Sequence, residues 1–175
     1  MPRYVAFLRG VMPTNAKMPV LRTAFESAGF TDVATVLGSG NVVFTARAAS
    51  ESGLERKAEA AMTKTMGRAF YTIVRPLEVL QQLIDADPYA AFRVAPNAKR
   101  VVTFSRTGHS GVLTLPIEVD GARILAVVGR EVFTAYLPTA RTPVFMTLIA
   151  KHFGPNVTTR TWETVARCVK VAGGR

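Results

Sequence analysis

The chain is poor in the side chains that most often build disulfides and metal sites: among 175 residues there are one cysteine and two histidines. Cys168 cannot form an internal disulfide without a second cysteine, which favours a reducing compartment. The histidines and the cysteine show no spacing typical of metal ligands. We therefore expect no metal site.

Long apolar runs are also absent. The N-terminal run Tyr4–Leu8 is too short for the core of a signal peptide. No stretch approaches the roughly 18 apolar residues that a membrane-spanning helix needs. We therefore expect a cytoplasmic protein with no membrane partner.

Acidic residues are scarce. The chain has 22 Lys and Arg against 12 Asp and Glu, which gives a net charge of +10. Residues 1–75 hold ten basic residues against five acidic ones, and residues 76–175 hold twelve against seven, so the excess is dispersed. A dispersed positive charge is compatible with a nucleic-acid partner and equally with a solvated surface. Nucleic-acid binding through this surface is one alternative function.

What the chain does have is a 49% share of hydrophobic residues, enough to bury a core. The first half predicts, in order, a strand, a helix, a two-stranded hairpin, a second helix and a fourth strand. They are expected at Tyr4–Leu8, at Pro19–Gly29, at Val33–Leu37 with Val42–Thr45, after a cap at Ser50 or Ser52, and at Tyr71–Val74. This order is that of the ferredoxin-like split-βαβ arrangement, in which the first and third strands are antiparallel neighbours.

The second half predicts a further set of helices and strands without the same regularity. Helices are expected from Pro76 and Pro143 and after a cap at Thr158 or Thr159, and strands at Arg100–Phe104, Ile117–Val119, Arg123–Val128 and Val132–Leu137. No low-complexity linker divides the chain. We predict an α+β fold in which a ferredoxin-like half, residues 1–75, is tightly packed on a second α+β subdomain, residues 76–175, as a monomer or a homodimer.

Nucleic acid is not expected on the sheet itself. A ferredoxin-like sheet binds RNA through aromatic side chains on one open face of its central strands. Tyr4 and Phe7 fall on opposite faces of the first strand, and the strands are apolar on both faces. We therefore expect the second face to be covered.

The turn Gly38-Ser39-Gly40-Asn41 predicts the one corner with ligand-binding character. Its two glycines permit positive φ angles. The predicted topology brings Arg9, at the end of the first strand, beside Ser39 and Asn41, with Lys17 close to a helix start. Arginine and backbone N–H groups at a helix start can form an anion site. Alternatively, Asn41 satisfies the turn backbone and Arg9 is solvated.

No catalytic constellation is evident. His109 lies in a Gly- and Ser-containing loop and could act as an acid or base on a phosphorylated metabolite, but no carboxylate lies nearby in sequence to orient it. Neither a Walker loop nor a dinucleotide fingerprint occurs, so we expect no cofactor. An enzyme is therefore the less favoured alternative, and no residue is predicted to be catalytic.

Three motifs resemble those of the bacterial family catalogued as domain of unknown function 1697. They are the stretches Tyr4–Gly10, Ser39–Phe44 and Thr158–Trp162. Family members commonly read Leu-Arg-Gly-Ile-Asn-Val-Gly-Gly, Ser-Gly-Asn-Val-Val-Phe and Thr-Thr-Arg-Asn-Trp-Asn-Thr-Val. This chain departs from them at Val11–Asn15, Thr161 and Glu163. The resemblance runs essentially end to end and implies an α+β fold without an established activity.

The shared Arg160-x-Trp162 has two interpretations, a helix cap with a packed anchor or a polar patch facing the first-half corner. We therefore predict a binding module for a small anionic or phosphate-bearing ligand, with five binding residues: Arg9, Lys17, Ser39, Asn41 and Arg160.

Overall fold

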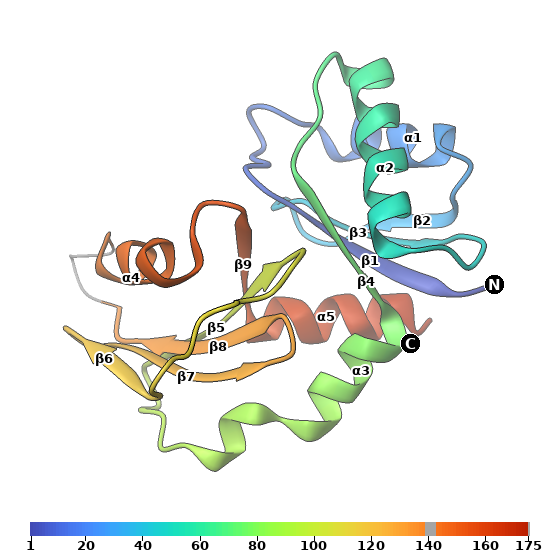
Figure 1. The fold of residues 1–175 in the computed structure, drawn as a ribbon. Coiled ribbons are helices and arrows are strands. Elements are labelled where there is room, and N and C mark those ends of the chain that lie inside the picture. The colour runs from blue at the N-terminus through green and yellow to red at the C-terminus, as the bar shows by residue number, and fades with distance from the viewer. Residues whose placement is uncertain (139–142, 175) are drawn as a thin grey trace. The chain divides into compact units, whose positions relative to one another are not determined.

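The computed structural model describes residues 1–138 and 143–174. Within these residues lie five α-helices and two antiparallel sheets, of four and five strands, which confirms the predicted α+β fold (Figure 1). The chain forms two compact units. Unit 1 comprises residues 1–85 and 165–175, and unit 2 comprises residues 86–164. Each unit is described by itself below.

Unit 1 contains the predicted split-βαβ arrangement. Its sheet has the strand order β2-β3-β1-β4. The strands are β1 (Arg3–Leu8), β2 (Thr31–Thr35), β3 (Asn41–Thr45) and β4 (Thr72–Pro76), with α1 (Met18–Ser27) between β1 and β2 and α2 (Glu51–Met66) between β3 and β4. As predicted, β1 and β3 are antiparallel neighbours at the centre of the sheet.

Local sequence signals explain where α2 begins and ends and where α1 begins. Ser50 precedes α2 and accepts a hydrogen bond from the Gly53 N–H at 3.1 Å. Gly67 ends the same helix with a φ of 77°, which glycine adopts without a steric penalty. α1 has Pro19 in its first turn. Lys17, the residue before the helix, makes no side-chain cap.

The sheet of unit 1 is buried on both faces, as the uninterrupted apolar strands predict. On one face it packs against α1 and α2 around Tyr4, Ala6 and Leu8. Side chains that alternate with these, Val5 and Phe7, are also fully buried. Because both faces are covered, neither Tyr4 nor Phe7 offers an open surface for stacking a base.

Unit 2 is built on a five-stranded sheet of order β6-β7-β8-β5-β9. Its strands are β5 (Lys99–Ser105), β6 (Ile117–Val119), β7 (Ala122–Val128), β8 (Glu131–Tyr136) and β9 (Val157–Thr161). A 3-10 turn (Pro88–Ala91) and α4 (Pro143–Phe153) belong to this unit, α3 (Leu77–Ala86) links the units, and α5 (Trp162–Ala172) starts in unit 2 and continues in unit 1.

The predicted cap of the last helix is wrong by two to three residues. Thr158 and Thr159 lie in β9 and pair with Phe104 and Thr103 of β5. Their β-branched side chains suit a strand, and the pairing with β5 satisfies their backbone. The cap is Thr161, whose Oγ1 accepts a hydrogen bond from the Thr164 N–H at 3.2 Å.

Among the described helices, none combines the length and the apolar character that crossing a membrane requires.

Candidate functional site

The predicted corner forms in unit 1, at one end of the β1–β3 pair. Phe7 lies opposite Asn41 in the register of the two strands. The Leu8 N–H donates to the Gly40 carbonyl at 2.8 Å, so the last residue of β1 is bonded to the turn itself. Arg9 follows directly and is exposed. The sheet thus brings Arg9 beside the 36–41 turn, as predicted.

The turn is held by its own backbone geometry. The Val36 N–H donates to the Asn41 carbonyl at 2.9 Å. Gly40 has a φ of 88°, and a Cβ added there would lie 2.9 Å from Cβ of Val11 and 3.1 Å from Cβ of Leu8. Only glycine fits, for both conformational and steric reasons. The other residue with positive φ is Leu37, at 60°, rather than Gly38.

Asn41 has a role in the turn that the sequence left open. Its side chain is completely buried. The Nδ2 group donates to the Val36 carbonyl at 2.9 Å and to Ser39 Oγ at 3.1 Å. Asn41 therefore satisfies the turn backbone and orients Ser39, which is exposed. Its contribution to any ligand site is to hold the turn in place.

A second asparagine, which the sequence analysis did not single out, organises the loop after Arg9. Asn15 Oδ1 accepts from the Met12 N–H at 2.8 Å, and Asn15 Nδ2 donates to the Gly10 carbonyl at 2.8 Å. Both bonds are local, as in the side-chain turns that asparagine favours. They fix the loop where this chain departs from the common family pattern.

A pocket of about 440 Å³ opens beside the turn. Gly38 lines it from the turn, and Lys17 lines it from the start of α1. The remaining lining residues are all apolar: Pro13, Ala16, Met18 and Pro19. Lys17 and Arg9 are the only charged residues in the segments 9–17 and 36–41. The corner therefore carries two positive charges and no carboxylate of its own.

Arg160, the fifth predicted site residue, belongs to β9 in unit 2. It is 9% exposed, and its Nη1 donates to Thr158 Oγ1 at 2.7 Å and to the Thr159 carbonyl at 2.8 Å. These bonds tie the guanidinium to its own strand. They support a structural role for Arg160.

Trp162, two residues on, is the anchor of an aromatic cluster in unit 2. Its ring lies edge-on to those of Tyr89 and Phe133, with centroid distances of 5.5 Å and 5.8 Å. The Tyr89 hydroxyl lies 2.9 Å from the carbonyl oxygens of Val101 and Thr134 and donates to them. Burial raises the pKa of Tyr89 well above its ordinary value of 10.0. This cluster accounts for Trp162 by packing.

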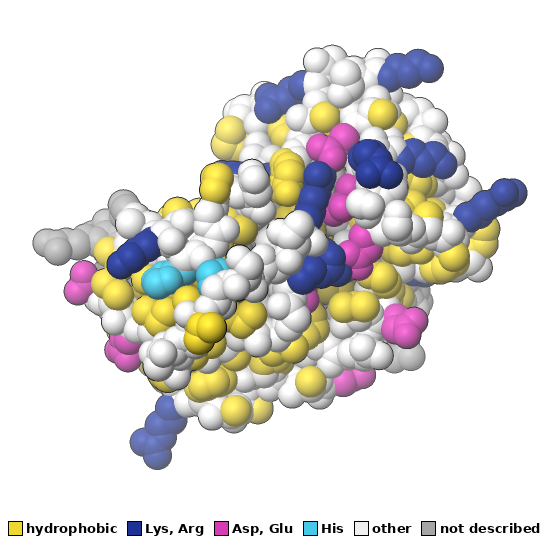
Figure 2. Space-filling view, in the orientation of Figure 1, with side chains coloured by type: hydrophobic (Ala, Val, Ile, Leu, Met, Phe, Trp, Pro, Cys, Tyr) yellow, Lys and Arg dark blue, Asp and Glu magenta, His cyan; other side chains and the backbone are white. Residues whose placement is uncertain are grey.

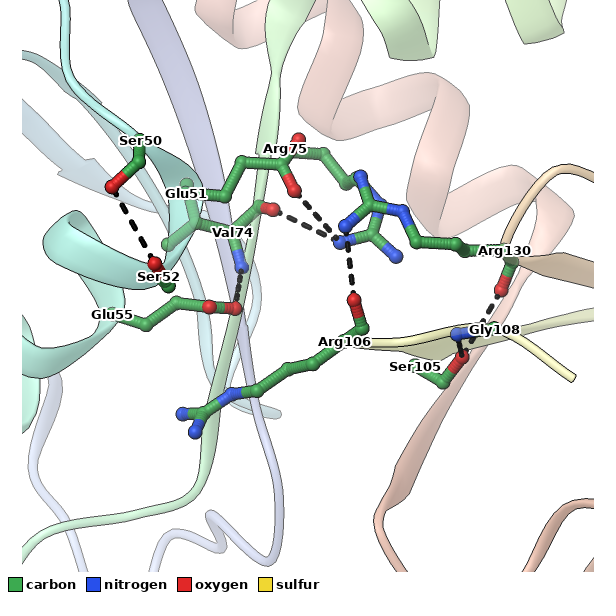
Figure 3. A network of polar contacts seen from close by, with 10 residues as sticks. All are labelled: Ser50, Glu51, Ser52, Glu55, Val74, Arg75, Ser105, Arg106, Gly108 and Arg130. Atoms are coloured by element: carbon green, nitrogen blue, oxygen red, sulfur yellow. Dashed lines mark hydrogen bonds and ion pairs between the residues drawn. The ribbon is translucent and has the colours of Figure 1, made fainter. Parts of the chain in front are cut away.

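Buried charges in unit 1 are explained by the open edge of β4. Figure 3 shows Glu55 pointing at the backbone of Val74, whose N–H donates to Glu55 Oε2 at 3.0 Å. Arg75 donates from Nη1 to the Val74 carbonyl at 3.1 Å and lies 3.6 Å from Glu51 Oε2. β4 is an edge strand, so these side chains serve backbone groups that no neighbouring strand pairs.

The two histidines and the cysteine, the side chains with catalytic potential, lie far from the corner in the sequence. The ring of His109 packs edge-on against Phe153 at a centroid distance of 5.2 Å. Figure 2 shows the two histidines, in cyan, at the surface of unit 2 beside hydrophobic side chains. Cys168 is fully buried in α5. In residues 1–138 and 143–174 no group of three His, Cys, Asp or Glu residues could hold a metal ion.

On the face of unit 1 that Figure 2 shows, Lys and Arg side chains lie at several places, with Asp and Glu side chains among some of them.

The fold defines the class: an α+β protein with a four-stranded βαββαβ sheet in one unit and a five-stranded antiparallel sheet in the other. The sequence matches the family described as "Protein of unknown function (DUF1697)" over residues 1–133, and the chain belongs to this family. This confirms the family that the motifs indicated: Tyr4–Gly10 and Ser39–Phe44 lie within the matched residues, and Thr158–Trp162 lies beyond them.

A solved structure has the same fold across its whole length. It is described as "The structure of conserved bacterial protein SP0830 from Streptococcus pneumoniae", is 18% identical to this chain, and superposes with a TM-score of 0.71 over 99% of each chain. At this identity the likeness concerns the fold alone. No protein with a curated description matches the sequence.

Proposed function

We propose that the corner of unit 1 binds a small anion, either free or as the phosphate or carboxylate group of a metabolite. Arg9, Lys17 and Ser39 supply the direct contacts, and Asn41 holds the turn that presents them. The observation that carries the proposal is the Leu8–Gly40 hydrogen bond of 2.8 Å, which fixes Arg9 beside the turn. A rigid backbone pair keeps these groups together before the ligand arrives, which lowers the entropic cost of binding.

Charge supports an anion over a neutral or cationic ligand. The two segments of the corner carry Arg9 and Lys17 and no acidic residue. An arginine guanidinium forms paired hydrogen bonds with phosphate or carboxylate oxygens. Lys17 immediately precedes α1, and the dipole of this helix also favours negative charge near its first turn.

The pocket beside the turn supports a ligand larger than an isolated anion. Its walls include Pro13, Met18 and Pro19, which offer apolar contact next to Lys17. Its volume of about 440 Å³ lies within the roughly 300–1,000 Å³ typical of small-molecule sites. A metabolite with one anionic group and a compact apolar body matches both features.

The test is calorimetric titration of the full chain with phosphate and with adenosine monophosphate, at constant ionic strength. Arg9→Ala should weaken binding by about tenfold, in line with the loss of one charge-assisted hydrogen bond pair. The matched control is Arg47→Ala, because Arg47 is exposed and follows the opposite end of β3 from Asn41. Equal affinities for the two variants, or no binding by the unaltered chain, would remove the proposal.

The same two variants distinguish anion binding at the corner from nucleic-acid binding over the dispersed basic surface. If a single-stranded oligonucleotide binds with a steep salt dependence and Arg9→Ala and Arg47→Ala weaken it equally, the dispersed surface and not the corner is the binding element.

A further inference from the structure

A groove of about 690 Å³ lies between α3 and α5 in unit 1. Figure 1 shows where these two helices lie. The groove shares no lining residue with the corner or its pocket. The lining combines apolar and charged residues from three parts of the unit: Pro2, Arg3, Pro76, Leu77, Glu78, Gln81, Ile84, Ala166, Val169, Lys170 and Gly173. The volume is within the range of small-molecule sites.

Each helix contributes one stripe of side chains to the groove. From α3 these include Leu77, Gln81 and Ile84, and from α5 they include Ala166 and Val169. The spacings of three and four residues place each set on one face of its helix. Leu77, Ile84 and Ala166 are only partly buried, so the groove presents apolar surface that the unit itself does not cover.

One end of the groove is positively charged and held in place. Arg3 donates from Nε to the Ala172 carbonyl at 3.0 Å, and from Nη1 to the Asp32 carbonyl and Thr45 Oγ1 at 3.0 and 2.9 Å. These bonds anchor the Arg3 guanidinium at the last turn of α5. Lys170 lies in the same last turn and is exposed.

The charge balance of the lining selects the charge of the ligand. Arg3 and Lys170 are the two cations, and Glu78 is the one carboxylate, so the lining carries a net charge of +1. A monoanion neutralises this charge, whereas a phosphate dianion would leave an excess of negative charge beside Glu78. Ala166 precedes Lys170 by one helical turn, so apolar surface begins next to the cations.

We propose that the α3–α5 groove binds a long-chain carboxylic acid. Its carboxylate lies at Lys170 and Arg3, and its hydrocarbon chain lies along Ala166, Val169 and Ile84. A linear chain suits an open groove lined by apolar residues of two helices, because hydrophobic contact requires no direction and grows with the area covered.

The proposal is tested by calorimetric titration of the full chain with sodium dodecanoate and octanoate, both below their micellar concentrations. Dodecanoate should bind at one site. Octanoate has four fewer methylene groups and should bind about tenfold more weakly, since roughly half of their transfer free energy is expected in an open groove. Equal affinities for the two acids would contradict a site for the hydrocarbon chain.

Lys170→Glu tests the carboxylate end, with Lys64→Glu as its control. Lys64 is an exposed lysine in the last turn of α2 and does not line the groove, so both variants change the net charge equally. Lys170→Glu should weaken dodecanoate binding about fivefold relative to the control. Equal binding by the two variants would overturn the assignment of the carboxylate.

Ala166→Phe fills the groove and tests its location. We expect unchanged circular dichroism and the loss of dodecanoate binding. A folded Ala166→Phe variant that binds dodecanoate normally would overturn the site, and so would a chain that binds phosphatidylglycerol vesicles but not free dodecanoate, which would indicate a membrane surface instead. Phosphate affinity at the corner is expected to be unchanged by Ala166→Phe, so the two sites fail or succeed separately.

Discussion

Arg9 and Arg160 belong to two of the three family motifs, and the structure places them in opposite environments. Arg9 ends β1 and is exposed, whereas Arg160 is 9% exposed and donates to Thr158 and Thr159 of its own strand. Two arginines that each belong to a family motif therefore need not have the same role. Burial and hydrogen-bond partners separate the arginine that can reach a ligand from the one that stabilises a strand.

The same distinction runs through the corner itself. Gly40 and Asn41 are buried and shape the turn, while Arg9, Lys17 and Ser39 are exposed beside it. Substitutions of the buried residues should change mainly the free energy of unfolding. Substitutions of the exposed residues should change mainly ligand affinity.

The largest expected effect is at the aromatic cluster of unit 2. Trp162→Ala removes contacts with Tyr89 and Phe133 and should lower the free energy of unfolding by about 3–5 kcal/mol. Urea denaturation measures this loss. Trp162→Phe retains an aromatic ring and should cost less. Arg9→Ala should change stability by less than about 0.5 kcal/mol, and a larger loss would mean that Arg9 too is structural.

The next effect concerns the turn. Gly40→Ala forces a Cβ to within 2.9 Å of Val11 at a φ of 88° and should destabilise the chain by about 3 kcal/mol. Gly10→Ala is the matched control, since Gly10 has a φ of 82° and nothing within 4 Å of an added Cβ. It should cost only about 1 kcal/mol. If denaturation gave the same loss of stability for Gly40→Ala and Gly10→Ala, the close approach of Val11 would not contribute to the cost.

The smallest effect is a pH dependence. Tyr89 has a folded-state pKa raised above 10.0, so the unfolded chain ionises first and stability falls as the pH rises above 10. Between pH 9 and pH 11 this group alone should remove about 1.4 kcal/mol. In denaturation curves recorded across this range, the free energy of unfolding of Tyr89→Phe should fall less steeply with pH, because this contribution is absent. An identical decline in both proteins would show that Tyr89 does not titrate on unfolding in this range.

The sequence predicts unit 1 well because its signals are local. Apolar runs such as Tyr4–Leu8 end at glycine or polar residues, and Ser50, one of the two serines expected to cap α2, does cap it. Given the order of elements, the β1–β3 pairing and hence the position of Arg9 beside the turn follow from topology.

Features that depend on distant residues could not be predicted in this way. β9 is polar, Val-Thr-Thr-Arg-Thr, and is a strand because β5 pairs with it along its length. Leu37 rather than Gly38 takes a positive φ, which the sequence disfavours. The α3–α5 groove joins residues that lie far apart along the chain, and no short motif marks it.

The most direct test of the central claim, that the corner of unit 1 binds an anion, is a titration of the isotopically labelled chain with phosphate, followed by amide chemical shifts at constant ionic strength. Saturable shifts are expected, confined to residues 9–18 and 37–41, which Arg9→Ala abolishes and Arg47→Ala preserves. Shifts that are absent, or that are spread over amides beside exposed Lys and Arg throughout the chain, would contradict it.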